Sequence, residues 1–280
     1  FLKVLGFDPA KHNVKTEIVA GITTFLTMAY ILAVNPDIFS ALEEMGMPKG
    51  AVFTATALAA IVGTLVMSIY AKKPYALAPG LGLNAFFVYT VCLTMGYSWQ
   101  FALTAVLIEG IIFIILTVTN VREAIINAIP KSMKSAVSAG IGLFIAFIGL
   151  VNAGIIVDDG GTIINLGTIT SGPALLAIVG LVITSVMMIL KVPGAMLIGI
   201  IVTAIIGIPF GITKFDGVVS AVPSVAPIFC KFEFHNILTW DMIIVVFTFL
   251  FIDMFDTIGT VIGVSKKANA MNPDGTIPGV

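Results

Sequence analysis

Charged side chains are scarce in this sequence. Only 10% of its 280 residues are Asp, Glu, Lys or Arg, and 14 basic residues nearly balance 15 acidic ones. Soluble domains carry about 25% charged residues, so the composition excludes a soluble globular protein. It also offers no basic surface to neutralise a nucleic-acid backbone. DNA and RNA are therefore not expected as partners.

Histidine and cysteine are also rare, with two of each. These numbers leave almost nothing for a structural metal site or a disulfide framework. The sequence contains no Ser-His-Asp set, no HExxH motif and no GxxxxGK[ST] loop, and His12 and His235 lie outside the apolar runs. We therefore expect neither an enzyme nor a bound metal.

Apolar residues are abundant, at 59% of the chain. A membrane-spanning helix needs about 20 of them in a row, and long continuous runs fit helices better than the alternating strands of a barrel. The sequence predicts an all-α polytopic membrane protein with eight segments. These are residues 17–34, 51–70, 75–95, 99–119, 134–152, 172–190, 193–212 and 239–264.

The positions of Lys and Arg predict the orientation, because short cytoplasmic loops are enriched in them. With eight spans and a cytoplasmic N-terminus, 11 of the 14 basic residues fall on the cytoplasmic side. Only Lys49, Lys214 and Lys231 remain on the other side. We therefore predict a multi-pass protein of the cytoplasmic membrane with both ends of this chain inside.

The third segment is interrupted by residues that do not fit a regular helix. Pro79, Gly80 and Gly82 lie within one turn of each other and precede Asn84. They predict a short extended stretch, residues 75–79, followed by a half-helix that begins near Gly82. Broken helices of this kind line the binding sites of secondary transporters. The alternative is a glycine-rich helix contact, with Asn84 bonded to a neighbouring backbone.

The eighth segment carries two acids, Asp253 and Asp256, near its centre. Their i, i+3 spacing places them on one face of a helix together with Thr257 and Thr260. A membrane-buried ionisable residue costs about 2.5–3.5 kcal/mol on insertion scales, so such a pair indicates a functional site. The alternative is that both acids only bond Thr hydroxyls or helix ends.

Further residues are candidates with an open role. Glu109 lies at the centre of the fourth segment, and no Lys or Arg falls inside any of the eight segments to pair with it. It is either a neutral acid bonded to a neighbouring helix or a carrier of protons. Phe25, Phe86 and Phe87 are candidates to supply an apolar face for a flat ligand, although aromatic residues at such spacing more often serve packing.

A short repeat connects the first and eighth segments. Thr24-Phe25-Leu26 recurs as Thr248-Phe249-Leu250, each near the middle of its segment. If the eighth segment opens a second repeat, each repeat has seven spans, and an odd number of spans makes the second repeat inverted.

Three motifs in this order resemble one family. They are the runs EIVAGITTFLTMAYI at 17–31, APGLGLNAFF at 78–87 and FIDMFDTIGT at 251–260. Together they resemble the adenine/guanine/hypoxanthine permease branch of the nucleobase–cation symporter-2 (xanthine/uracil permease-like) family. The resemblance implies fourteen segments in two inverted repeats of seven. This chain would then hold the first repeat and the first segment of the second, and would be truncated after about the eighth segment.

The resemblance also implies a division into domains and a set of site residues. Residues 1–119 and 238–280 would belong to a core domain and residues 120–237 to a gate domain. Asn84 and Asp253 match positions that bind the purine, and Asp256 matches a second acid needed for transport. We add Gly82 and Phe25 to the predicted substrate site, and Glu109 and Thr257 to the predicted proton-coupling network. The family's purine-binding glutamate of segment ten falls beyond this chain.

The residues and the resemblance together predict a secondary active transporter for proton-coupled uptake of adenine, guanine or hypoxanthine. The expected partners are a purine nucleobase and the lipid bilayer, and a homodimer is left open. No cofactor is expected beyond the coupling ion, for which we favour a proton over sodium. The alternatives are a uracil or xanthine carrier and, less favoured because of the two aspartates, a related-fold transporter of inorganic anions.

Overall fold

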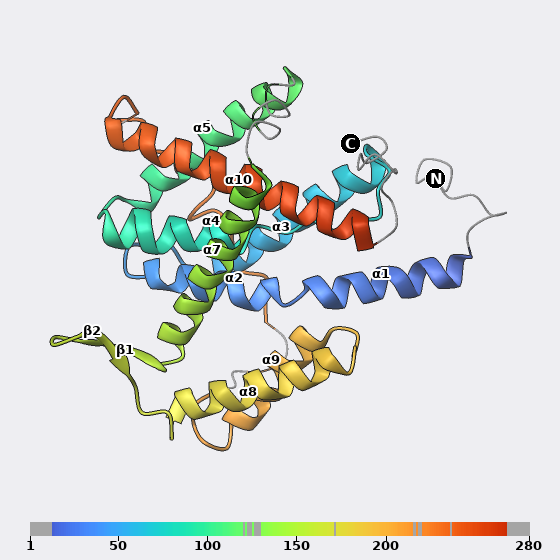
Figure 1. The fold of residues 1–280 in the computed structure, drawn as a ribbon, viewed down its shortest axis with the longest axis vertical. Helices are drawn as coiled ribbons and strands as arrows, with labels where there is room; N and C mark the ends of the chain where they lie inside the picture. The colour runs from blue at the N-terminus through green and yellow to red at the C-terminus, as the bar shows by residue number, and fades with distance from the viewer. Residues whose placement is uncertain are drawn as a thin grey trace. The chain divides into compact units, whose positions relative to one another are not determined.

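A computed structural model describes residues 13–119, 121, 125, 130–170, 172–214, 217, 220–235 and 237–267. The chain forms two compact units. The first comprises Phe1–Val34, Phe53–Ala78 and Ala146–Pro223, and the second comprises Asn35–Val52, Pro79–Ile145 and Ser224–Val280. The helices (Figure 1) are α1 (Val14–Met28), α2 (Ile31–Phe39), η1 (Ser40–Leu42), α3 (Lys49–Ile69), α4 (Leu81–Ala85), η2 (Phe86–Thr94), α5 (Trp99–Val118), α7 (Lys131–Asn152), α8 (Gly172–Ile189), α9 (Ala195–Gly207) and α10 (Trp240–Lys267).

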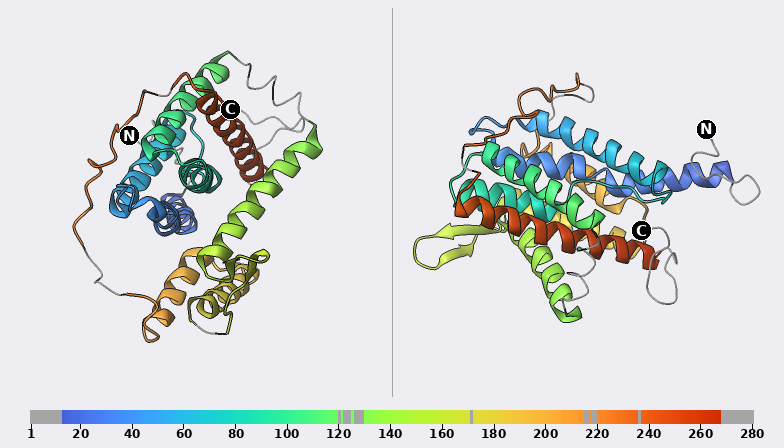
Figure 2. Two further views of the ribbon diagram at one scale, coloured as in Figure 1. Left: turned by 90° about the vertical axis from the view of Figure 1, so that its left-hand side faces the viewer. Right: turned by 90° about the horizontal axis from the view of Figure 1, so that it is seen from above.

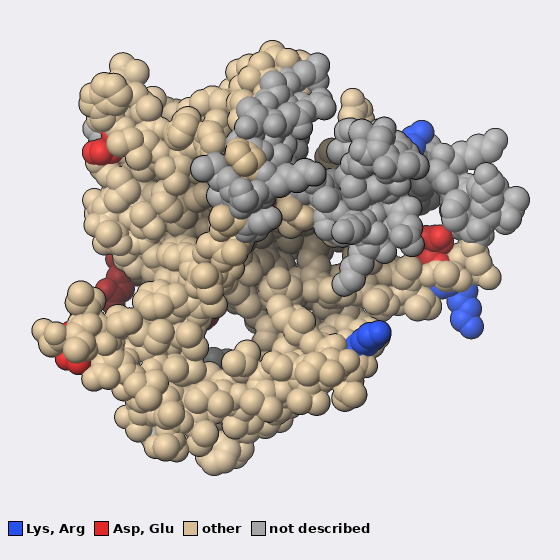
Figure 3. Space-filling model, viewed as in Figure 1, with Lys and Arg blue, Asp and Glu red and all other residues tan. Residues whose placement is uncertain are grey.

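Each of the eight predicted segments contains a helix. The first one extends beyond its predicted end, because α2 and η1 continue the apolar stretch to Leu42. Among the described residues, four helical stretches are long and apolar enough to cross a membrane, Val14–Leu42, Lys49–Ile69, Trp99–Val118 and Gly172–Ile189. Charged side chains are sparse on the described surface seen in Figure 3. These features fit a polytopic membrane protein.

The prediction of an all-α fold is wrong in one place. A two-stranded antiparallel hairpin, β1 (Ile156–Asp159) and β2 (Ile163–Leu166), follows α7. Its turn is held by the Asp159 carboxylate, which accepts hydrogen bonds from Gly161 N at 3.0 Å and from Thr162 and Asn165. These hydrogen bonds lower the pKa of Asp159, and the bond from the Gly161 backbone N–H has the largest effect. A Gly-Gly turn between β-branched residues favours a hairpin over a plain loop.

Within the first unit, α8 and α9 pack through small residues. A Cβ at Gly180 of α8 would overlap Thr203 of α9, and one at Gly199 of α9 would overlap Thr184 of α8. Both helices therefore carry the same Gly-x-x-x-Thr spacing and use it reciprocally. Close backbone approach at such positions is the usual way in which membrane helices associate.

Within the second unit, α10 packs along α5 and against α4 (Figure 2). Hydrogen bonds hold the N-terminal ends of α5 and α10 together. Tyr97 donates a hydrogen bond to Asp241 in the first turn of α10, and Ser98 donates one to Glu233. The backbone N–H of Glu233 donates to the buried Thr104 hydroxyl at 2.8 Å. The bond to Asp241 is the main cause of a raised pKa of Tyr97. The N-terminal end of α10 is thereby held against the start of α5.

An aromatic cluster fills the second unit beside η2. The Phe249 ring, 1% exposed, lies 5.1 Å from that of Phe86, and Phe87 lies 5.2 Å from Phe39, measured between centroids. Such tilted and edge-to-face pairs add about 0.5–1.5 kcal/mol each beyond area burial. Phe86 and Phe87 thus contribute to packing.

Candidate functional site

The broken third segment has the predicted form. Residues 72–80 are non-helical, and α4 begins at Leu81, one residue before the predicted start. Gly80 is the N-cap, with extended backbone angles of φ −73° and ψ 123°. Beyond α4 the chain continues as the π-helix η2, a rare form that is frequent at functional sites.

A threonine of α3 holds the extended stretch in the first unit. The Thr64 hydroxyl accepts a hydrogen bond from Leu77 N at 3.0 Å and donates one to Leu77 O at 3.2 Å. Irregular backbone is tolerated at membrane depth only where its polar groups are satisfied by protein or a wet cavity. Sequence analysis did not identify Thr64, because the apolar run 51–70 holds three Thr residues and nothing in the sequence distinguishes one of them.

Asp256 lies beside the N-cap of α4. A Cβ added at Gly80 would lie only 2.8 Å from the Asp256 Oδ2 atom. The absence of a side chain at position 80 therefore lets the carboxylate approach the start of the half-helix. Helix N-termini present free N–H groups and the positive end of the dipole, which favour a carboxylate.

We expect Gly80→Ala to displace the Asp256 carboxylate. Overpacking of this kind costs about 1–3 kcal/mol, and Ala is also a poorer N-cap than Gly. In the full-length protein the variant should therefore lower both thermal stability in detergent and uptake of the transported compound. Gly149→Ala is the matched control, since a Cβ at Gly149 meets nothing within 4 Å. Equal uptake by the two variants would contradict the assigned contact.

Gly82 is buried, and helix packing explains why a glycine stands at this position. A Cβ at this position would lie 2.7 Å from Ile141 Cγ2 of α7. The close approach of helices was the alternative drawn from the sequence. A contact between Gly82 and substrate stays a prediction.

Asn84, in the first turn of α4, is bonded to another side chain. Its Nδ2 donates to the Oδ1 atom of Asn35 at 2.5 Å, and Asn35 is only 4% exposed. The backbone N–H of Asn84 donates to Gly80 O at 3.2 Å. Sequence analysis did not identify Asn35, although the Asn-Pro pair directly after the predicted first segment is a signal that could have indicated it.

The aspartates of α10 are both half-buried and lie one helical turn apart. Thr257 Oγ1 lies 3.5 Å from Asp253 Oδ1, at the outer limit of a hydrogen bond. Thr260 instead donates to the backbone oxygen of Asp256 at 2.8 Å. Of these two hydroxyls, that of Thr257 is therefore the one positioned to donate a hydrogen bond to the Asp253 carboxylate.

Glu109 of α5 is 6% exposed, and within the described residues its Oε1 atom has no hydrogen-bond partner. Asp253 lies close enough to interact electrostatically with the Glu109 carboxyl group. Two acids on neighbouring helices, one with an unsatisfied oxygen, form an unusual and costly arrangement at membrane depth. Within the second unit, Gly82 and Asn84 lie on α4 and Glu109 lies on α5. Asp253, Asp256 and Thr257 lie on α10, which packs against both of these helices.

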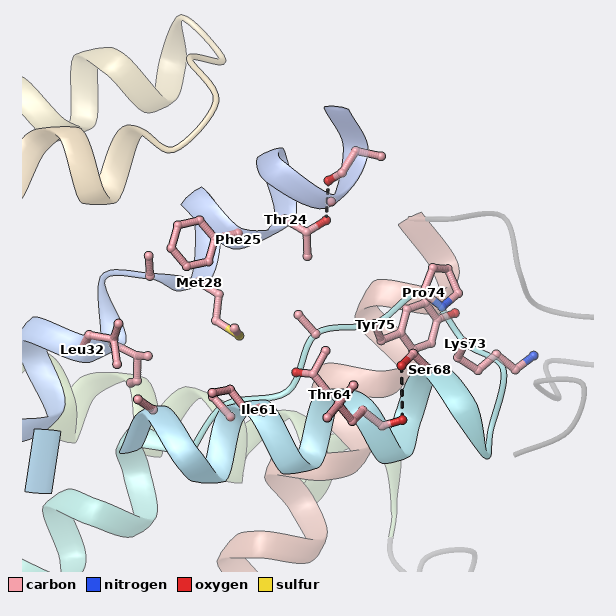
Figure 4. A pocket seen from close by; sticks show the side chains of 18 of the residues that line it. Thr24, Phe25, Met28, Leu32, Ile61, Thr64, Ser68, Lys73, Pro74 and Tyr75 are labelled. Carbon is pink, nitrogen blue, oxygen red and sulfur yellow. Dashed lines mark hydrogen bonds between the residues drawn. The ribbon is translucent and has the colours of Figure 1, made fainter. Parts of the chain in front are cut away.

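Phe25 belongs to the first unit, where it lines a cavity of about 640 Å³. Figure 4 shows Phe25, Met28 and Leu32 on one side of this space, with Ile61 and Thr64 of α3 on the other. The lining is mostly apolar and also includes Thr24 and Tyr75. The cavity can accept an apolar or aromatic surface, and a role of Phe25 in substrate binding stays a prediction.

Known proteins similar to this chain are membrane permeases. It is 48% identical over 279 residues to a protein of Methanocaldococcus jannaschii named only as a permease, covering 99% of this chain and 63% of that protein. It is 47% identical over 275 residues to the guanine/hypoxanthine permease PbuG of Bacillus subtilis, covering 95% and 62%. Its identity to the adenine permease AdeP of Escherichia coli is 39% over 264 residues, covering 94% and 59%.

The chain spans about three fifths of the length of these curated relatives. The family model described as Permease family matches residues 15–277. This match covers nearly the whole chain and includes the broken third segment and both aspartates of α10. The chain therefore belongs to this permease family, the nucleobase–cation symporter-2 family.

Proposed function

We propose that the full-length protein is a secondary active transporter that takes up purine nucleobases together with protons across the cytoplasmic membrane. The observation that carries this proposal is the pair of aspartates on α10, one beside the start of the broken helix α4 and the other near Glu109. Relatives named as guanine/hypoxanthine and adenine permeases support a purine as the substrate.

The proposed site matches the chemistry of a purine. The edges of the ring carry N–H donors and ring-nitrogen or carbonyl acceptors, and its faces are apolar. Asp253 would accept hydrogen bonds from ring N–H groups, and the amide of Asn84 offers both a donor and an acceptor. Gly82 would let the ring approach the backbone.

Coupling would use the acids of α5 and α10. Glu109 is the proposed proton carrier because its buried oxygen lacks a hydrogen-bond partner among the described residues. Asp256 and Thr257 would complete the polar network around Asp253. Movement of a core domain, residues 1–119 and 238–280, against a gate domain, residues 120–237, would expose the site to each side in turn.

The proposed orientation places the N-terminus in the cytoplasm. It is supported by the distribution of 11 basic residues on one side and three on the other, which together account for all 14. A homodimer remains compatible with this arrangement.

Uptake of labelled hypoxanthine, adenine, guanine and uracil tests the function. The full-length protein would be expressed in cells that lack their own nucleobase carriers and assayed with and without a protonophore. We expect purine uptake that the protonophore abolishes.

Three outcomes would contradict parts of the proposal. Uptake of uracil alone would show that the substrate is a pyrimidine and not a purine. Purine uptake that needs sodium rather than a proton gradient would exclude proton coupling. Transport of none of the four bases, with the protein present in the membrane, would overturn the function. Sulfate and bicarbonate exchange would then be assayed.

A further inference from the structure

One hydrogen bond in the second unit determines how Asn84 is oriented. Asn84 Nδ2 donates to Asn35 Oδ1 at 2.5 Å, and Asn35 is 4% exposed. The two residues are 49 positions apart in the sequence, so this contact exists only because α2 and α4 fold together. A buried amide is retained only where its polar atoms are hydrogen-bonded.

The geometry of an amide makes this bond consequential. The side-chain amide of Asn is planar, with Oδ1 and Nδ2 on opposite sides of the Cγ atom. When Nδ2 is committed to Asn35, Oδ1 is directed away from that residue and is left as a hydrogen-bond acceptor. As long as the Asn35 amide keeps its own rotation, turning the Asn84 amide by 180° would place two carbonyl oxygens against each other and exchange the acceptor for a donor.

We infer that Asn35 is a positioning residue for base selectivity. It holds the Asn84 amide in one rotation, so that carbonyl Oδ1 rather than the NH₂ group is presented to the base. The inference rests on the proposed purine site. Purines with a 6-oxo group carry an N–H donor at N1, whereas adenine has an acceptor at N1 and an amino donor at position 6. A fixed amide distinguishes these two patterns, and an amide free to rotate does not.

The test compares hypoxanthine with adenine in the full-length protein. Asn35→Leu removes the acceptor with little change in volume, so the ratio of the apparent KM values for the two bases should move toward one by about 3- to 10-fold, the effect of one net hydrogen bond. Asn35→Asp keeps an oxygen acceptor toward Asn84 and should retain the wild-type ratio. Rates are normalised to the amount of protein in the membrane.

A double-mutant cycle shows whether Asn35 acts through Asn84. In an Asn84→Ala background, Asn35→Leu should change the KM ratio no further, because the amide to be positioned is gone. If Asn35→Leu does not reach the membrane, Asn35→Ala takes its place. Thr104→Val is the matched control, since it removes another buried hydrogen bond of the second unit. It should lower stability without altering the KM ratio.

The outcomes separate this inference from the proposed function. If the wild-type protein carries neither base, the proposed function fails. If the wild type carries them and Asn35→Leu keeps the wild-type KM ratio, the positioning role alone is overturned. It is also overturned if Asn35→Asp behaves like Asn35→Leu, or if the two substitutions in the cycle are additive.

Discussion

Replacing Asp253 by Asn in the full-length protein is expected to lower the uptake of purine nucleobases by about 10- to 150-fold. Asn keeps the size of the side chain and one acceptor oxygen but loses the negative charge. Hydrogen bonds to a charged group contribute about 1.5–3 kcal/mol, and each 1.4 kcal/mol is a factor of ten in affinity. Exchange of internal for external base should be lost as well, because binding itself is weakened.

The measurement is initial uptake of labelled base per amount of protein in the membrane. Asp37→Asn is the matched control, since Asp37 forms an exposed salt bridge with Lys49 at 2.9 Å. Exposed pairs of this kind contribute about 0–1 kcal/mol, so uptake should stay close to that of the wild type. Unchanged uptake in Asp253→Asn would remove Asp253 from the binding site.

Local signals in the sequence predicted the broken helix well. Pro79 and Gly80 disfavour a regular helix by their own backbone properties, and α4 begins at the next residue, Leu81. The hairpin of β1 and β2 was missed, although its Gly160-Gly161 turn is also a local signal. A search for apolar runs of about 20 residues does not detect strands of four residues each.

Contacts between distant residues could not be predicted in the same way. The approach of Asp256 to Gly80 and the bond between Asn35 and Asn84 depend on how α10, α4 and α2 pack. Gly82 illustrates a different limit. A glycine at this position fits either a ligand or a neighbouring helix, and the proximity of Ile141 is visible only in the folded chain.

Replacing Glu109 by Gln should separate binding from energy coupling. Gln has nearly the same shape and remains neutral, but it cannot release or take up a proton. One proton moving across 100 mV supplies about 2.3 kcal/mol, enough for about 50-fold accumulation of a co-transported base. The variant should still bind and exchange bases, while its accumulation ratio falls to about one.

Accumulation and exchange are therefore measured side by side in the same cells or vesicles. Glu109→Asp keeps an acid at this position and should restore part of the accumulation, which a purely structural role would not require. The buried Oε1 atom without a partner in the described structure is the reason to expect this difference. Wild-type accumulation in Glu109→Gln, with unchanged sensitivity to a protonophore, would instead make Glu109 a neutral structural acid. Asp253 and Asp256 of α10 would then be the next acids of this chain to test as carriers of the coupling proton.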